Sequence, residues 1–213
     1  MNRVPTDSLI ERLSGEAKAV EPLAPPARRA FATFAVAGAG SLALILLAGD
    51  AAGMRQRYAG QHWLMLGESA AMLTTFILAV LAAFIVAVPG RSKSWLLAPL
   101  PAFATWFALS GLGCLTGSIR PELEHSTDCL AFILGSSLVV GLPLLWRLSR
   151  AHPIDPLPVA LLGGLGAAAL SAFLLQFFHP FSLTLLDLGV HFGAVLLVLG
   201  LATMFRRMML APA

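Results

Sequence analysis

Long, almost wholly apolar stretches recur along the chain and are separated by short polar segments. Each stretch has about 20 residues, enough for a helix rising 1.5 Å per residue to cross the roughly 30 Å hydrocarbon core of a bilayer. Backbone groups in hydrocarbon must be hydrogen-bonded within their own segment, so these stretches are predicted to be helices. The six predicted spans are Ala30–Gly49, Glu68–Val88, Trp95–Thr116, Cys129–Trp146, Leu157–Phe178 and Leu183–Phe205.

The residues before the first apolar stretch follow a different pattern. From Thr6 to Val20, apolar side chains recur at helical spacing and polar side chains cover the other positions, which predicts a short amphipathic helix. Its apolar positions are Leu9, Ile10, Leu13, Ala17 and Val20. Residues 1–29 hold five basic and four acidic groups. A helix that lies on lipid is normally strongly basic, so this balance favours a groove on a protein partner. The alternative is a loosely ordered helix without a partner.

Composition agrees with a membrane protein. Of the 213 residues, 58% are hydrophobic and only 12% are charged, whereas a soluble domain carries roughly 25% charged residues. The mean hydropathy is +0.83. The net charge of +3 does not indicate nucleic-acid binding, because basic residues of a membrane protein mostly mark its cytoplasmic loops. We therefore expect an all-α polytopic membrane protein with six transmembrane helices and a short cytoplasmic N-terminal amphipathic helix.

The distribution of basic residues predicts the orientation. With the N-terminus in the cytoplasm, eleven lysines and arginines fall on the inside and three on the outside, namely Arg55, Arg57 and Arg120. By the positive-inside rule both termini are expected to be cytoplasmic. The predicted regions are a cytoplasmic segment at 1–29, a six-helix transmembrane domain at 30–207 and a cytoplasmic tail at 208–213. The length and acidity of the first segment argue against a cleaved signal peptide.

The chain is poor in catalytic groups. It has no Gly-rich phosphate loop, HExxH motif, paired carboxylates or Ser/His/Asp arrangement, so we expect neither an enzyme nor a cofactor. A small transporter is the alternative, but transporters usually need charged residues inside the membrane and broken helices. The polar residues expected inside the spans are Asp187, His191, Gln176 and scattered serines and threonines.

Two cysteines are candidate reactive residues. Cys129 follows Ser126-Thr127-Asp128, a helix-start signal in which Thr127 or Asp128 would be the N-cap. Cys129 would then lie in the first turn of the fourth span, on the outer side, where the positive end of the helix favours a thiolate. The carboxylate of Asp128 and those of Glu122 and Glu124 act against this effect. A small buried hydrophobe is the alternative.

The second cysteine, Cys114, lies near the outer end of the third span. The connection between the two cysteines is short and their helices are antiparallel, so a disulfide is geometrically conceivable. The ordinary interpretation of Cys114 is a small buried hydrophobe. His125, His179 and His191 are expected on the same side, and thiolate with imidazole would suit zinc, copper or a softer heavy metal. Each histidine alone is more often a hydrogen-bonded core or interfacial residue, so metal binding stays open.

Several short motifs, in their order and spacing, resemble the NrsF family of six-span membrane anti-sigma factors. They are Asp7–Ile10, Leu23–Pro26, Val88–Ser92, Trp95–Leu97, Gly111–Leu115, Cys129–Leu134, Pro143-Leu144, and His191 with the small residues after it. The resemblance covers essentially the whole chain.

What the resemblance implies is a bacterial inner-membrane protein that binds an extracytoplasmic-function (ECF) sigma factor, without direct contact to nucleic acid. Residues 1–29 would hold the sigma factor through Leu9, Ile10, Arg12 and Leu13, and oxidative or heavy-metal stress on the outer side would release it. In the family, outer-face cysteines are the sensors, and one of them matches Cys129. A second is common before a proline after the fifth span, where this chain has His179. That difference leaves three options: a single thiol; a Cys129–Cys114 bridge; or a Cys/His site with His125, Asp128, His179 or His191 as possible partners.

Overall fold

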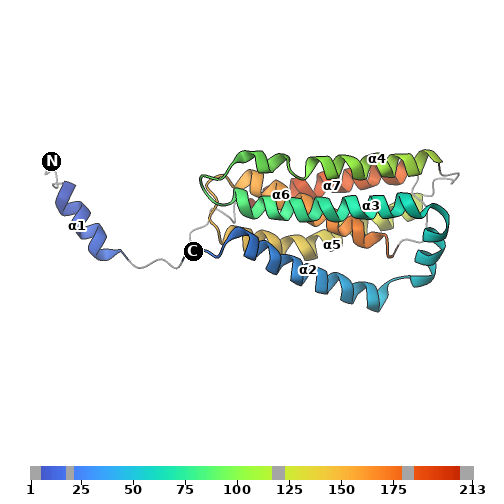
Figure 1. The fold of residues 1–213 in the computed structure, drawn as a ribbon, viewed down its shortest axis with the longest axis horizontal. Helices are drawn as coiled ribbons and strands as arrows, with labels where there is room; N and C mark the ends of the chain where they lie inside the picture. The colour runs from blue at the N-terminus through green and yellow to red at the C-terminus, as the bar shows by residue number, and fades with distance from the viewer. Residues whose placement is uncertain (1–5, 18–21, 117–122, 179–184, 207–213) are drawn as a thin grey trace.

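The computed structural model describes residues 6–17, 22–116, 123–178 and 185–206, without the side chains of residues 56–62, 116, 123–128, 185 and 187. Over these residues the chain is all-α and contains no strand (Figure 1). Its α-helices are α1 (Thr6–Glu16), α2 (Pro26–Ala48), α3 (Ala51–Val86), α4 (Leu100–Thr116), α5 (Leu123–Ser149), α6 (Pro156–Leu175) and α7 (Leu185–Met204). A short 3-10 helix, η1 (Lys93–Leu97), precedes α4.

The predicted spans correspond to helices. Five segments are long and apolar enough to cross a membrane: Pro26–Ala48, Trp63–Val86, Lys93–Leu115, Cys129–Ser149 and Pro156–Leu175. A shorter apolar helix, Leu188–Met204, corresponds to the predicted sixth span. The chain is therefore a polytopic all-α membrane protein, as its hydropathy pattern predicted.

Helix α6 forms the centre of the bundle and packs against α3, α5 and α7. Its side chains are buried along almost its whole length, which small residues make possible because they let neighbouring backbones approach. A Cβ atom at Gly166 would lie 2.8 Å from Val80 Cγ2 on α3, and one at Gly164 would lie 2.8 Å from Ala202 Cβ on α7. These small residues let α6 pack closely against α3 and α7.

Helix α3 is longer than the predicted second span. It begins at Ala51, where the Asp50 carboxylate accepts hydrogen bonds from the backbone N–H groups of Ala52 (3.1 Å) and Gly53 (3.0 Å). Figure 1 shows the first turns of α3 lying across the end of the bundle before the helix bends into it. The stretch before Glu68 was expected to be an outer loop, and this was wrong because Asp50 caps a helix there.

The bundle has two chemically different ends. At one end α2, α4 and α6 begin and α3, α5 and α7 end; we call it the basic end. Its described basic residues are Arg28, Arg29, Arg91, Lys93, Arg147, Arg150 and Arg206. The opposite, cysteine end holds Cys114 near the end of α4 and Cys129 near the start of α5.

Candidate functional site

Helix α1 presents an apolar face that nothing in the described structure covers. Leu9, Ile10 and Leu13 are 40%, 58% and 56% exposed, and every other residue of the helix is exposed as well. Arg12 lies beside this face, and its guanidinium is 3.9 Å from the Glu16 carboxylate one turn later. Figure 1 shows α1 apart from the bundle. The predicted amphipathic helix thus exists, and its apolar side is available for a partner.

Cys129 lies deeper in its helix than the sequence indicated. Helix α5 begins at Leu123 and not at the predicted N-cap, so Cys129 is almost two turns inside it. The expected effect of a helix N-terminus on this thiol is therefore wrong, because that effect falls off within the first turn.

The Cys129 side chain is only 1% exposed and packs in a small cluster with Ile133, Leu175 and Ala194. These neighbours come from α5, α6 and α7. Cys114 on α4 is also buried, with 9% exposure, and no disulfide joins the two described cysteines. Both cysteines are therefore buried, and Cys129 packs among apolar side chains, as expected of a small buried hydrophobe.

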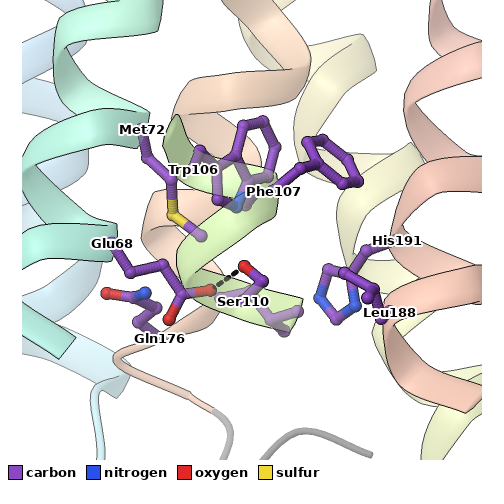
Figure 2. Close-up of a pocket in the computed structure, with 10 residues that line it drawn as sticks. Glu68, Met72, Trp106, Phe107, Ser110, Gln176, Leu188 and His191 are labelled. Carbon is purple, nitrogen blue, oxygen red and sulfur yellow. Dashed lines mark hydrogen bonds between the residues drawn. The ribbon is translucent and has the colours of Figure 1, made fainter. Parts of the chain in front are cut away.

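A small, mostly apolar cavity that also receives four polar side chains lies between α3, α4, α6 and α7, at the same end of the bundle as the cysteines. Its volume is about 30 Å³, and Glu68, Ser110, Gln176 and His191 are among its lining residues. Figure 2 shows these four side chains converging below Met72, Trp106 and Phe107. Such a cavity is large enough for one or two water molecules but not for an organic substrate.

Hydrogen bonds across the helices hold this cavity together. The Ser110 hydroxyl of α4 donates to Glu68 Oε1 of α3 (Figure 2). The Ser69 hydroxyl of α3 donates to Gln176 Oε1, just beyond the end of α6. All four side chains are buried. Because carboxylates are rare and expensive inside a membrane segment, Glu68 is a candidate functional residue.

The cavity and the Cys129 cluster share a wall. Leu175 lines the cavity and also packs in the cluster with Cys129. On α7, His191 faces the cavity and Ala194, one turn later, faces the cluster. A change in volume at Cys129 would therefore displace the residues around Glu68, since packed interiors transmit strain.

The proposed partners of the cysteines are only partly visible. His191 is buried and lines the cavity. The side chains of His125 and Asp128 on α5, and the whole of His179, lie outside the described residues. Among the residues that are described, no group of three or more His, Cys, Asp or Glu side chains could hold a metal ion.

Glu68 is the site residue that sequence reasoning assigned to the wrong environment. It was predicted to be the first residue of the second span, at the membrane surface, but it lies inside the apolar segment Trp63–Val86 and is 6% exposed. The signal was present: Trp63, Leu64 and Leu66 precede it, so the apolar stretch begins before the carboxylate.

A second polar contact joins α2 to α5 at the basic end. Arg29 Nη2 donates to the backbone oxygen of Arg147 (2.9 Å), and Arg147 Nη1 lies 3.4 Å from Thr33 Oγ1. The Arg29 guanidinium also lies over the ring of Phe84, 4.8 Å from its centre. Helix α5 therefore carries Cys129 near one end and touches α2 at the other.

The chain belongs to the NrsF family, whose family model is described as "negative regulator of sigma F" and matches residues 13–211. This confirms the resemblance seen in the sequence, and it makes the chain a negative regulator with a sigma factor as its partner. The match begins at Leu13, so the predicted binding positions Leu9, Ile10 and Arg12 precede it. Comparisons with curated proteins and with solved structures found no match.

Proposed function

We propose that the protein is an inner-membrane anti-sigma factor that sequesters an ECF sigma factor on α1 and releases it when Cys129 is modified. Residues 1–29 form the binding segment and both termini face the cytoplasm. The inducing stress is an oxidant or a thiol-binding heavy metal. The protein works through binding and conformational change rather than catalysis.

The observation that carries the proposal is the uncovered apolar face of α1. An isolated helix of 11 residues gains little stability from its own hydrogen bonds, so most of its stabilisation must come from packing against something else. Leu9, Ile10 and Leu13 supply the side chains that a helix lays into a hydrophobic groove. Arg12 on the flank can pair with a carboxylate at the rim of that groove.

Helix α5 offers a physical connection between the thiol and α1. The 18 residues from Cys129 to Arg147 span about 27 Å, most of the membrane thickness. At its far end, Arg147 receives the hydrogen bond from Arg29 in the first turn of α2. Residues 17–25, of which 17 and 22–25 are described, separate the end of α1 from the start of α2. A displacement of α5 would therefore reach the helix next to the sigma-binding segment.

Burial of Cys129 gives the switch its energy source. A sulfenic acid oxygen or a bound metal ion on this sulfur needs room that the contacts with Ile133, Leu175 and Ala194 do not provide. Added volume in a packed core typically costs about 1–3 kcal/mol. Full release, from 1% to 99%, requires roughly 5.5 kcal/mol of differential stabilisation. The bond to sulfur is present in both states, so the lost core packing is what favours release, and it supplies part of this difference.

The decisive experiment measures how tightly the full-length protein in nanodiscs binds a purified ECF sigma factor, the one encoded beside the gene. The Leu9→Asp/Leu13→Asp variant is expected to lose binding by at least about 100-fold, because it places charge in an apolar groove. The matched control is Ser8→Asp/Gly15→Asp, which adds the same charge to the opposite side of α1. Gly15 has open space around its Cα, so the control introduces no clash.

Equal loss in both variants would show that charge alone weakens binding, and it would remove the apolar face from the mechanism. Retained binding in the Leu9→Asp/Leu13→Asp variant would place the sigma-binding site elsewhere. Release is tested in the same assay with hydrogen peroxide or Cd²⁺, where Cys129→Ser is expected to remain bound and Cys114→Ser to respond like the unmodified chain. A Cys129→Ser variant that still releases the sigma factor would refute the sensing step.

The transporter alternative finds some support in the buried Glu68, because intramembrane carboxylates often mark ion pathways. A pathway must connect both sides of the membrane, however, and the cavity at Glu68 is only about 30 Å³. Deletion of residues 2–29 separates the two functions: it should abolish retention of the sigma factor and leave any transport intact.

A further inference from the structure

An apolar groove of about 420 Å³ lies between α2 and α5. Val36, Ala37 and Leu44 line it from α2, Val139 and Val140 line it from α5, and Phe76 and Leu174 close it from α3 and α6. The rim residues Val36 and Val139 are 63% and 75% exposed. The groove is therefore open to the hydrocarbon along its length, and its volume is in the roughly 300–1,000 Å³ range of ligand sites.

One end of this groove is cationic. Arg147 lines it, and the guanidinium of Arg29 lies beside Arg147, donating to its backbone oxygen at 2.9 Å. Trp146 next to Arg147 is 51% exposed, and its ring stacks under Arg150, whose Cζ is 3.9 Å from the ring centre. Tryptophan and arginine together mark the level of lipid headgroups, so this end of the groove lies at the membrane surface.

Neither arginine has an acidic partner among the residues that the structure describes. Within the described part of the chain, the ion pairs are Arg12–Glu16 and Lys93–Asp155, and neither involves Arg29 or Arg147. Arg29 Nη1 is buried and has no hydrogen-bond partner there. Two neighbouring positive charges, one of them partly buried, are costly without an anion nearby.

We propose that the groove between α2 and α5 binds an anionic glycerophospholipid. One acyl chain lies between the two helices, and the phosphate lies at the basic end near Arg29 and Arg147. Basic pockets between transmembrane helices recognise phospholipid headgroups in this way, because guanidinium groups match phosphate oxygens. The apolar groove binds the acyl chain, and the arginine pair gives the preference for a negatively charged headgroup.

The dimensions of the groove favour an acyl chain over a protein segment. The groove residues Ala37 and Gly40 are small, which leaves a slot suited to a single extended chain. The inference concerns lipid binding alone and does not depend on the role of α1.

The test is native mass spectrometry of the full-length protein, delipidated in detergent and titrated with phosphatidylglycerol. Phosphatidylcholine with the same acyl chains tests the charge, and glycerol phosphate tests the headgroup without chains. We expect the protein to bind phosphatidylglycerol at least about tenfold more tightly than phosphatidylcholine, and glycerol phosphate not measurably. Equal affinity for the two lipids would overturn the proposal, as would tight binding of glycerol phosphate, which would indicate a simple anion site.

Matched variants distinguish the groove from the general lipid surface. Gly40→Leu fills the groove, and its added Cβ meets nothing within 4 Å, so the fold should tolerate it. Gly38→Leu makes the same change on α2 at a position that has the same open space but does not line the groove. Loss of phosphatidylglycerol binding in the first variant and retention in the second are expected. Identical behaviour of the two variants would refute the site.

Charge variants test the headgroup contact. Arg29→Gln/Arg147→Gln is expected to lower the affinity for phosphatidylglycerol about 30-fold, because each arginine at the membrane surface contributes one interaction with the anionic headgroup. The affinity for phosphatidylcholine should not change. Arg28→Gln, at the neighbouring exposed position, is the control and should have little effect. The proposal is wrong if the double variant retains its preference for phosphatidylglycerol. It is also wrong if a second copy of the chain occupies the groove in a lipid-free dimer.

Discussion

Cys129 has a side chain that is 1% exposed, and this burial controls its chemistry. Thiol reagents attack the thiolate and must reach the sulfur, whereas apolar surroundings disfavour the charged form and exclude the reagent. Modification of Cys129 therefore requires a local opening between α5 and its neighbours. A sensor built in this way would respond to small, penetrating species and resist bulky ones.

This predicts slow alkylation of Cys129. In detergent-solubilised protein carrying Cys114→Ser, we expect Cys129 to react with N-ethylmaleimide about 100-fold more slowly than an exposed thiol, because local opening of packed segments costs a few kcal/mol. The reference is a Gly15→Cys variant without native cysteines, since Gly15 lies on the exposed helix α1. Rates are followed by intact mass spectrometry. Equal rates would mean that the Cys129 pocket is open in solution.

Glu68 gives a second prediction at the residue scale. Its carboxylate accepts the hydrogen bond from Ser110 in a buried cavity, so Glu68→Ala leaves a buried hydroxyl without this acceptor. We expect a loss of about 1–3 kcal/mol of stability, with a lower midpoint of thermal unfolding in detergent. Glu68→Gln keeps an acceptor oxygen and should lose clearly less. Equal destabilisation by both changes would indicate that the negative charge itself stabilises the fold.

At the scale of the helices, α6 is the element on which the bundle depends. It contacts α3, α5 and α7, and its glycines set how closely those helices approach. No large hydrophobic side chain could replace Gly164 or Gly166 without moving a neighbouring helix. The pattern of small residues at four-residue spacing carried this information in the sequence.

Gly166→Ala is therefore expected to destabilise the protein by about 1–3 kcal/mol, because its Cβ would lie 2.8 Å from Val80 Cγ2. The control is Gly200→Ala on α7, where a Cβ meets nothing within 4 Å. There the loss of glycine flexibility should leave stability unchanged or raise it by up to about 1 kcal/mol. Unfolding in a denaturant series in mixed micelles measures both. A neutral Gly166→Ala would show that α3 and α6 can separate at little cost.

The elements were largely predictable from the sequence because hydropathy determines which segments can lie in lipid. The six apolar stretches, the helical spacing of Leu9, Ile10 and Leu13, and the close packing of α6 all followed from local pattern. The starts of α3 and α5 did not, because the Asp50 cap lies before the apolar stretch and Ser126-Thr127-Asp128 gave a start signal six residues inside the helix or less. The Glu68–Ser110 contact was not predictable either, since it joins residues 42 positions apart.

At the scale of the whole molecule, the two ends of the bundle have separate chemistry. The cysteine end combines a buried thiol with the Glu68 cavity, and the basic end combines the arginine pair with the groove between α2 and α5. Helix α5 belongs to both ends, and Arg29 is hydrogen-bonded to its last turns. A movement of α5 would therefore change the groove and the position of α2 together.

The orientation of the bundle is the prediction on which the sigma-factor role depends. The predicted topology puts eleven of the 14 lysines and arginines on the same side as both termini, so that side should be cytoplasmic. Fusion of a fluorescent protein that folds only in the cytoplasm, after Ala213 or after Gly90, should be bright. Alkaline phosphatase, which is active only outside, should be active when inserted after Ser118 and inactive at the other two positions.

The reverse pattern of reporter activity would place α1 outside the cell. A sigma factor acts on RNA polymerase in the cytoplasm, so the apolar face of α1 could not then bind it. The arginine pair would also meet the outer leaflet, and its phospholipid would have to come from that side. In the sequence, Gly90 precedes η1 and Ser118 follows α4. Opposite reporter activities at these two positions would therefore also show that the segment between them crosses the membrane.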